Sequence, residues 1–191
     1  MTGKTIFGLV SVALAATGYT SYAVTVLRGR TRPHLFSWWI WGLVMAVAAA
    51  VQVTNGAGAG AWVTVFSAAA CLAIALLLLR HGDRNIAATD WAALAAALTI
   101  IPAWAATNNP LLAVVMASAI EWLGYYPTMR KSWLRPHEET SITYSLDLAK
   151  WLMSLWALTT WSAVTLIYPL ALLAANALLV TIILGRRARL T

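Results

Sequence analysis

The triplet Arg32-Pro33-His34 recurs as Arg135-Pro136-His137, 103 residues further along the chain. Each copy follows one long apolar segment and precedes another. The match extends beyond the triplet, because Arg28 aligns with Lys131 at the same offset. Internal repeats of this kind mark duplicated structural units. The recurrence therefore predicts two copies of one small helical bundle, joined tail to head.

The composition predicts that the lipid bilayer is the solvent of this chain. Of its 191 residues, 61% are hydrophobic and 10% are charged, and the mean hydropathy is +0.75. A water-soluble domain of this size cannot hide so much apolar surface. A transmembrane helix needs about 20 apolar residues. Seven segments of about that length cover nearly the whole chain: 5–27, 35–54, 58–80, 89–106, 110–130, 141–160 and 163–184.

These segments predict an all-α polytopic membrane protein with seven transmembrane helices. We expect two parallel three-helix bundles, at 1–85 and 109–191, joined by a linker helix within 86–108. An odd number of intervening spans gives both bundles the same orientation. The first segment has an alternative interpretation as a signal peptide. Its apolar run continues to Leu27, however, and the repeat needs this segment to complete its first copy.

The basic residues predict the orientation. Eleven lie in alternate connections or in the C-terminal tail, and only Lys4 lies on the other side. The eleven are Arg28, Arg30, Arg32, Arg80, Arg84, Arg130, Lys131, Arg135, Arg186, Arg187 and Arg189. Since cytoplasmic loops are enriched in Lys and Arg, we expect a cytoplasmic C-terminus and an N-terminus outside, in a bacterial inner membrane. The net charge of +7 is explained by this topology and by contact with lipid, so we expect no nucleic-acid partner.

Three ionisable residues lie inside the expected spans: Glu121, Asp147 and Lys150. Such residues are costly in lipid and usually face a bundle interior or a water-filled cavity. Glu121 and Lys150 each lie about halfway along their segments, which predicts an ion pair between them. Asp147 lies one turn from Lys150 on the same helix face. The group could bind a small polar solute or a proton, or it could be a structural ion pair that fixes helix register.

Aromatic and amide side chains accompany these charges. Tryptophan rings can stack on a ring or a cation, and a buried amide needs a hydrogen-bond partner. The additional candidate substrate-binding residues are Trp41, Trp122, Tyr125, Trp151 and Asn176. The sequence contains no nucleophile–base pair and no metal-ligand spacing. We therefore expect neither an enzyme nor a bound metal or cofactor.

The run Tyr126-Pro127-Thr128-Met129-Arg130-Lys131-Ser132-Trp133 resembles the second motif of the PQ-loop proteins, which include the SWEET sugar facilitators. With the following polar loop, it also resembles a group of uncharacterised bacterial inner-membrane proteins. The resemblance implies the arrangement of three plus one plus three helices, and a proline hinge at Pro127. The family's glutamine is Thr128 here. Asn176 matches the last-helix asparagine of the sugar facilitators, whereas Ala69-Ala70 stand at its partner position, so the paired-asparagine clamp is missing.

These patterns favour a transporter that moves a small polar solute by alternating access, either as a facilitator or linked to protons. The alternative is a receptor, sensor or assembly partner with the same fold and no transport. A third interpretation, a retinal-type Schiff base on Lys150, is disfavoured because intramembrane lysines are usually paired. The sequence leaves open the solute, the coupling ion and whether the chain forms a homo-oligomer.

Overall fold

The computed structural model describes residues 2–29, 35–81, 88–138 and 141–190, and every regular element within these ranges is helical. The all-α prediction is therefore confirmed, while the triplet Arg32-Pro33-His34 lies outside the described residues. The elements, in chain order, are α1 (Gly3–Leu27), α2 (Leu35–Thr54), the 3-10 helix η1 (Gly58–Ala61), α3 (Trp62–His81), α4 (Ala88–Thr107), α5 (Pro110–Leu134), the 3-10 helix η2 (Pro136–Glu138), α6 (Ser141–Ala157) and α7 (Ala163–Leu190).

Several helix ends differ from the expected segments, among them the end of α5, which continues past residue 130 to Leu134. We expected a helix to residue 160, but α6 ends at Ala157. One reason is that the backbone N–H of Thr159 donates to the carbonyl of Ala57 at 3.0 Å, outside its own helix. At the other end of the chain, α7 continues past residue 184 to Leu190. Arg187 and Arg189 lie in its last turn, where positive charge stabilises a helix C-terminus.

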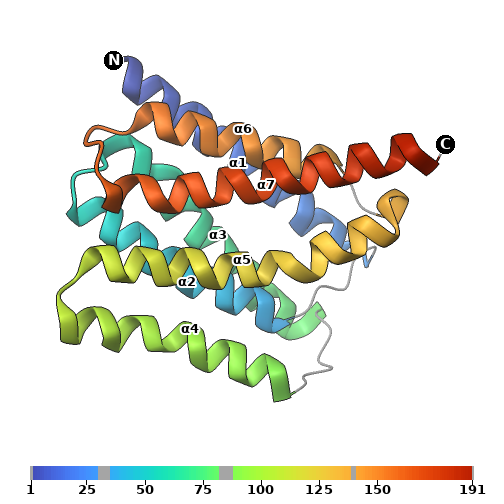
Figure 1. The fold of residues 1–191 in the computed structure, drawn as a ribbon, viewed down its shortest axis with the longest axis horizontal. Coiled ribbons are helices and arrows are strands. Elements are labelled where there is room, and N and C mark those ends of the chain that lie inside the picture. Colours follow the sequence, from blue (N-terminus) through green and yellow to red (C-terminus); the bar gives the residue numbers. More distant parts are fainter. Residues whose placement is uncertain (1, 30–34, 82–87, 139–140, 191) are drawn as a thin grey trace.

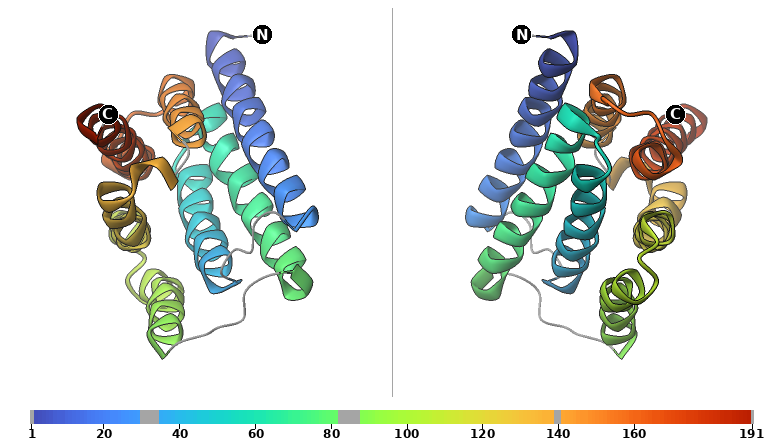
Figure 2. Two further views of the ribbon diagram at one scale, coloured as in Figure 1. Left: turned by 90° about the vertical axis from the view of Figure 1, so that its right-hand side faces the viewer. Right: turned by 90° about the vertical axis from the view of Figure 1, so that its left-hand side faces the viewer.

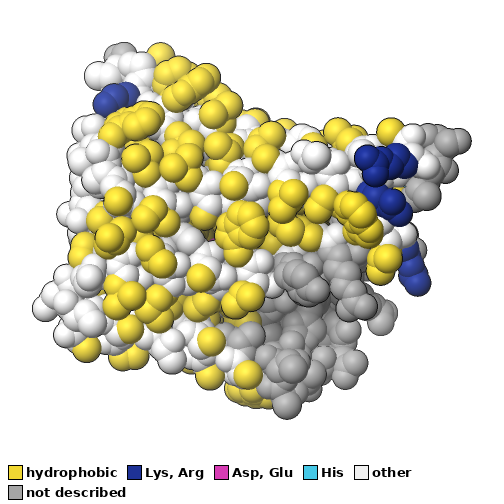
Figure 3. All heavy atoms as spheres, in the orientation of Figure 1, with side chains coloured by type: hydrophobic (Ala, Val, Ile, Leu, Met, Phe, Trp, Pro, Cys, Tyr) yellow, Lys and Arg dark blue, Asp and Glu magenta, His cyan; other side chains and the backbone are white. Residues whose placement is uncertain are grey.

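The surface and the helix lengths are those of a membrane protein. Within the described residues, four helical stretches are long and apolar enough to cross a membrane: Gly3–Leu27, Ser37–Thr54, Gly58–Arg80 and Ala163–Arg189. Large apolar side chains point outward, among them Leu123 with 73% of its surface exposed. Figure 3 shows hydrophobic side chains spread over most of the visible face. A soluble protein rarely exposes such continuous apolar area.

The first three helices pack in the order α1, α3, α2. Helix α3 lies against both neighbours, whereas the backbones of α1 and α2 lie further apart and these helices meet through side chains, as where the Tyr22 and Trp38 rings lie 4.7 Å apart between centroids. One close approach fixes the register of α2 and α3. A Cβ at Gly42 would lie 2.6 Å from the side chain of Leu72. A side chain at this position of α2 would therefore displace Leu72.

The last three helices pack in the same order, α5, α7, α6, with α7 between the other two. The two groups meet where α1 packs against α6 and where α2 packs against α5. Smaller contacts join α3 to α6 and α2 to α7, and α4 lies against α2 and α5. The three views in Figures 1 and 2 show α1–α3 beside α5–α7, with α4 at the margin.

The helix bundle has two chemically different ends. The basic end carries the basic residues that follow or close the odd-numbered helices: Arg28, Arg80, Arg135, Arg186, Arg187 and Arg189. The opposite end, which we call the Lys4 end, contains the start of α1, the η1 turn and the α6–α7 connection. In Figure 3 several basic side chains gather near the C-terminus, and one lies near the N-terminus.

Candidate functional site

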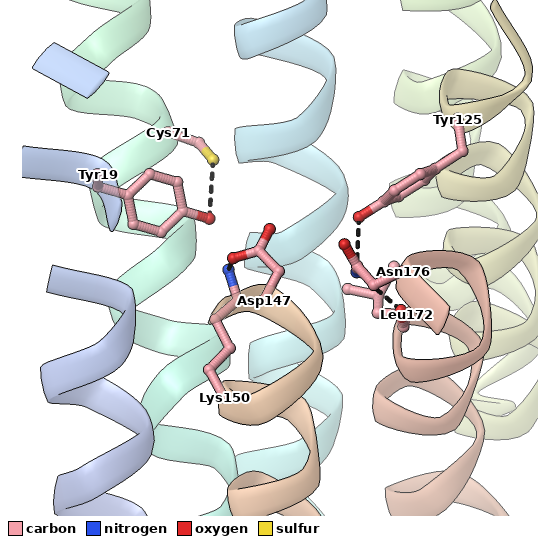
Figure 4. A network of polar contacts seen from close by, with 7 residues as sticks. All are labelled: Tyr19, Cys71, Tyr125, Asp147, Lys150, Leu172 and Asn176. Atoms are coloured by element: carbon pink, nitrogen blue, oxygen red, sulfur yellow. Dashed lines mark hydrogen bonds and ion pairs between the residues drawn. The ribbon is translucent and has the colours of Figure 1, made fainter. Parts of the chain in front are cut away.

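An ion pair lies on α6, between Lys150 and Asp147. The Nζ of Lys150 is 2.6 Å from Oδ1 of Asp147, and the two side chains are 3% and 28% exposed. Figure 4 shows this pair at the centre of a polar network. The predicted Glu121–Lys150 ion pair is wrong. Asp147 lies one turn away on the same helix and reaches the ammonium locally, while Glu121 bonds to a different partner.

Glu121, on α5, is almost fully buried and accepts a hydrogen bond from Tyr168, on α7. The Tyr168 hydroxyl lies 2.9 Å from Oε1 of Glu121, and Glu121 is 1% exposed. The Tyr168 ring meets Trp151, on α6, edge to face at 5.9 Å between centroids. This geometry is favourable for aromatic pairs. Tyr168 thus connects all three helices of the second group, through its hydroxyl to Glu121 and through its ring to Trp151.

The first group of helices reaches the ion pair through Tyr19, on α1. The Nζ of Lys150 lies over the Tyr19 ring, 4.9 Å from its centroid. Its distance to the Trp151 ring is 5.4 Å, so two aromatic faces stabilise one cation. The Tyr19 hydroxyl also accepts a weak hydrogen bond from the Cys71 thiol, on α3, at 3.7 Å. The environment of Lys150 is therefore shared between α1, α3 and α6.

Tyr125 and Asn176 form the third part of the network, between α5 and α7. The Nδ2 of Asn176 donates to the Tyr125 hydroxyl at 3.0 Å and to the Leu172 carbonyl at 2.8 Å. Its Oδ1 is buried without a hydrogen-bond partner among the described residues. Asp147 interacts electrostatically with both Tyr125 and Tyr19. Figure 4 shows its carboxylate between these two tyrosines. Trp151 contacts both Lys150 and Tyr168, so the three parts form one cluster.

The remaining predicted site residues lie elsewhere. Trp122 is on the outer surface, where its indole N–H donates to the carbonyl of Ala171 at 3.0 Å and ties α5 to α7. Trp41, on α2, packs directly against Gly124, on α5: a Cβ at Gly124 would lie 2.9 Å from the Trp41 Nε1. Pro127 falls within the bounds of α5, but its side chain lies outside the described residues, and the hinge stays a prediction.

Access to the cluster differs between the two ends of the bundle. On the face of α6 that carries the ion pair, Tyr144 and Asp147 are half-buried, whereas Lys150 and Ser154 are buried. Exposure therefore decreases from the basic end toward the Lys4 end. Asp147 is therefore the more exposed member of the ion pair.

The Lys4 end is closed by direct contact between η1 and the end of α6. The hydroxyl of Ser154 donates to the carbonyl of Gly60 at 2.8 Å. A Cβ at Gly60 would lie 2.5 Å from the Leu158 side chain, and one at Gly58 would overlap Thr159. Gly58 also has a φ of +61°, which glycine adopts without strain. Small residues thus allow a segment between α2 and α3 to press against α6, and we call this contact the η1–α6 closure.

Sequence reasoning missed Tyr168, Tyr19 and Cys71 as members of the cluster. A signal for Tyr168 was present, since Tyr168, Leu172 and Asn176 follow i, i+4, i+8 spacing and share one face of α7. All three are fully buried. Tyr19 and Cys71 carried no comparable signal, because their position depends on how the first group of helices meets the second.

No protein-family model, no curated protein and no solved structure matches the chain. The likeness to PQ-loop proteins therefore rests on the residues quoted above. The described residues also contain no group of three or more His, Cys, Asp or Glu side chains that could hold a metal ion. Ion pairing, hydrogen bonding and cation–π contact are the chemistry that the observed cluster offers.

Proposed function

We propose that this chain is a seven-helix transporter that moves a small polar solute across a bacterial inner membrane by alternating access. The observation that carries the proposal is the cluster around Asp147 and Lys150. It lies between the two groups of helices and takes side chains from both. Intramembrane ionisable residues at such a position commonly mark a substrate or ion pathway.

The packing of the helices supports two equivalent bundles joined by a linker helix. Exchange of α1, α2 and α3 for α5, α6 and α7 turns the α1–α6 contact into the α5–α2 contact. The same exchange turns the α3–α6 contact into the α7–α2 contact. Each set of contacts is thus matched by its counterpart, as expected for duplicated bundles in a transporter. α4 then serves as the linker of the PQ-loop arrangement.

The shortest proposed span is α6, with 17 residues. At about 1.5 Å per residue it covers about 26 Å, close to the roughly 30 Å of the hydrocarbon core. Its length and the charges of Asp147 and Lys150, which lower its hydropathy, leave α6 outside the four helical stretches that are by themselves long and apolar enough to cross a membrane. With all seven helices crossing, the basic end faces the cytoplasm by the positive-inside rule.

The hydrogen-bond acceptors still available in the cluster indicate which kind of solute would bind. Both N–H groups of Asn176 are used, and its buried Oδ1 still requires a donor. Asp147 bonds Lys150 through Oδ1 and is partly exposed. A solute with N–H or O–H donors, including a cationic amine, would satisfy both acceptors. Tyr125 already accepts a hydrogen bond and can donate its own hydroxyl proton to such a solute.

The η1–α6 closure supports one state of the proposed transport cycle. At the Lys4 end η1 packs against α6, and Asp147, nearer the basic end, is more exposed than Lys150. In the proposed orientation this is an inward-facing state. The outward-facing state requires η1 to separate from α6 as one bundle rocks against the other.

Uptake measurements with purified protein in liposomes test the proposal. A thermal-shift screen of amines, amino acids and polyols identifies candidate solutes first, since a ligand of the folded state raises the melting temperature. We expect saturable uptake of a stabilising compound, lost in Asp147→Asn and Glu121→Gln. Thr99→Val is the matched control, because this hydroxyl is exposed on α4 and bonds only its own helix. Normal uptake in both site variants would exclude these residues from transport.

One observation favours the alternative of a receptor, sensor or assembly partner. Glu121 and Lys150 are almost completely buried, and each already has a bonding partner. A network whose charged groups already have partners can have a purely structural role, in which it fixes the register of the helices. A receptor or sensor built on this network would bind its ligand without moving it across the membrane. A compound that raises the melting temperature but accumulates no faster than in protein-free liposomes would identify it.

A further inference from the structure

Buried polar groups without a protein partner are concentrated where α2 and α3 pack together. Both amide atoms of Gln52, the hydroxyl of Thr64 and the hydroxyl of Ser67 are buried and make no hydrogen bond to a described residue. All three side chains are fully inaccessible from outside the bundle. Buried polar groups in native proteins are nearly always bonded to protein or to ordered water. The concentration of orphaned atoms here therefore points to a ligand.

Gln52 and Thr64 lie at a similar level along α2 and α3. Gly42 and Leu72 face each other across α2 and α3, and the two helices are consecutive and antiparallel. Gln52 lies ten residues after Gly42 on α2, and Trp62 lies ten residues before Leu72 on α3. Gln52 and Trp62 are therefore at the same level. Thr64 is two residues from that level, which is about 3 Å along the helix axis. Gln52 and Thr64 thus occupy the same layer of the first bundle, near the Lys4 end.

The polar row continues from this layer to the ionisable cluster. Thr64, Ser67 and Cys71 follow i, i+3, i+7 spacing and share one buried face of α3. Seven residues of helix span about 10 Å. The Ser67 hydroxyl lies near that of Tyr19 but outside hydrogen-bonding geometry. At the end of the row the Cys71 thiol contacts Tyr19, whose ring lies against Lys150.

We propose that Gln52, Thr64 and Ser67 bind a file of water molecules that carries protons between the Lys4 end and the Tyr19–Cys71 contact. At the start of this file, Asn55 is half-buried and Gly56 is exposed. An amide offers two donors and an acceptor, and each hydroxyl offers a donor and an acceptor. Each group can therefore hold a water on either side, as buried waters that make about three hydrogen bonds require. The η1–α6 closure excludes a solute at this end, whereas a water file beside it admits protons.

The proton transfer is balanced at every step. A hydronium ion at the Lys4 end gives a proton to the first water, and each water or hydroxyl accepts one proton and releases another. At the far end the thiol of Cys71 exchanges its hydrogen, so that S–H and D₂O give S–D and HDO. The use of this route to supply protons for transport rests on the proposed function. The exchange at Cys71 does not, so the two claims can fail separately.

The single cysteine of the chain makes the test specific. The infrared S–H stretching band of the reconstituted protein arises from Cys71 alone, and its decay after transfer to D₂O measures proton delivery to this site. We expect complete exchange in the wild type. In the Thr64→Val/Ser67→Ala variant we expect exchange to slow by about tenfold, the effect of removing roughly one hydrogen bond's contribution to water binding. Thr99→Val, which alters an exposed hydroxyl on α4, should exchange at the wild-type rate.

Two results would overturn the proposal. One is an S–H band that persists in the wild type, and the other is equal exchange in the wild type and the double variant, which would mean delivery from the basic end. Thr64→Val and Gln52→Met supply a second readout with little change of shape. If the site holds water, neither variant raises the melting temperature. If it is dry, removal of an orphaned polar group raises the melting temperature clearly, which would also refute the water file.

Discussion

The ammonium of Lys150 lies 2.6 Å from Asp147, its neighbour one turn earlier on α6, and the two side chains differ in exposure, at 3% and 28%. This asymmetry has an energetic consequence. A buried cation that loses its partner cannot be hydrated, whereas a half-buried carboxylate can.

We therefore expect Asp147→Asn to destabilise the protein more than Lys150→Met. Loss of one member of a buried pair costs about 3–5 kcal/mol. We expect a cost in this range for Asp147→Asn, which leaves the buried Lys150 ammonium without its partner. The stranded carboxylate retains access to water, so Lys150→Met should cost about 1–3 kcal/mol. The measurement is the free energy of unfolding in lipid nanodiscs. The double variant Asp147→Asn/Lys150→Met should recover part of the loss, and strictly additive losses would contradict the pairing.

Tyr168→Phe isolates the hydrogen bond to Glu121. The phenylalanine ring preserves the edge-to-face contact with Trp151, while Oε1 of Glu121 loses its donor. We expect a loss of about 1.5–3 kcal/mol if the carboxyl group is ionised. In a Glu121→Gln background the same substitution should cost about 1 kcal/mol, the value for a neutral hydrogen bond. Equal costs in the two backgrounds would show that Glu121 is uncharged in this state.

The η1–α6 closure can be opened by adding a methyl group. In Gly60→Ala the new Cβ meets Leu158 and the carbonyl of Ser154 within 3 Å, and overpacking of this kind costs about 1–3 kcal/mol. The probe is Ser154→Cys in a Cys71→Ala background. We expect this cysteine to react faster with a hydrophilic maleimide when Gly60→Ala is also present. Gly185→Ala is the control, since a Cβ at this position would have no neighbouring atom within 4 Å. Unchanged labelling would mean that this contact does not limit access.

The orientation makes a prediction at both ends of the bundle. Asn108, between α4 and α5, lies at the Lys4 end, and Arg189 lies at the basic end. In a Cys71→Ala background, Asn108→Cys should react with an impermeant maleimide on intact cells. Arg189→Cys should react only after the membrane is permeabilised. Reaction of both cysteines on intact cells would refute an odd number of spans between residues 108 and 189.

The sequence was sufficient to predict the helices and the burial of Glu121 and Lys150. Charges are so costly in lipid that Glu121, Asp147 and Lys150 had to converge inside the bundle. It was not sufficient to predict their partners, which depend on the rotation of each helix about its axis. Glu121 and Trp122 illustrate this point. Adjacent residues point about 100° apart on a helix, so the inward position of Glu121 places Trp122 outside.

Helix order was also beyond the sequence. The apolar residues of α3 and α4 lie on all sides of these helices, so hydrophobic periodicity does not show which face packs inward. The partnership of Tyr19 with Lys150 depends on α1 packing against α6, a contact between segments more than 100 residues apart. The repeat predicted two bundles, but the contact between them is a property of the folded chain.

Uptake by proteoliposomes tests the central claim most directly. The compound that raises the melting temperature most is offered in radiolabelled form to liposomes containing the wild type, Asp147→Asn or Thr99→Val. The account predicts saturable uptake in the wild type and in Thr99→Val, and uptake reduced by about tenfold or more in Asp147→Asn, as expected when a charge-assisted contact of roughly 1.5–3 kcal/mol is lost. Wild-type uptake no faster than in protein-free liposomes, or undiminished uptake in Asp147→Asn, would contradict it.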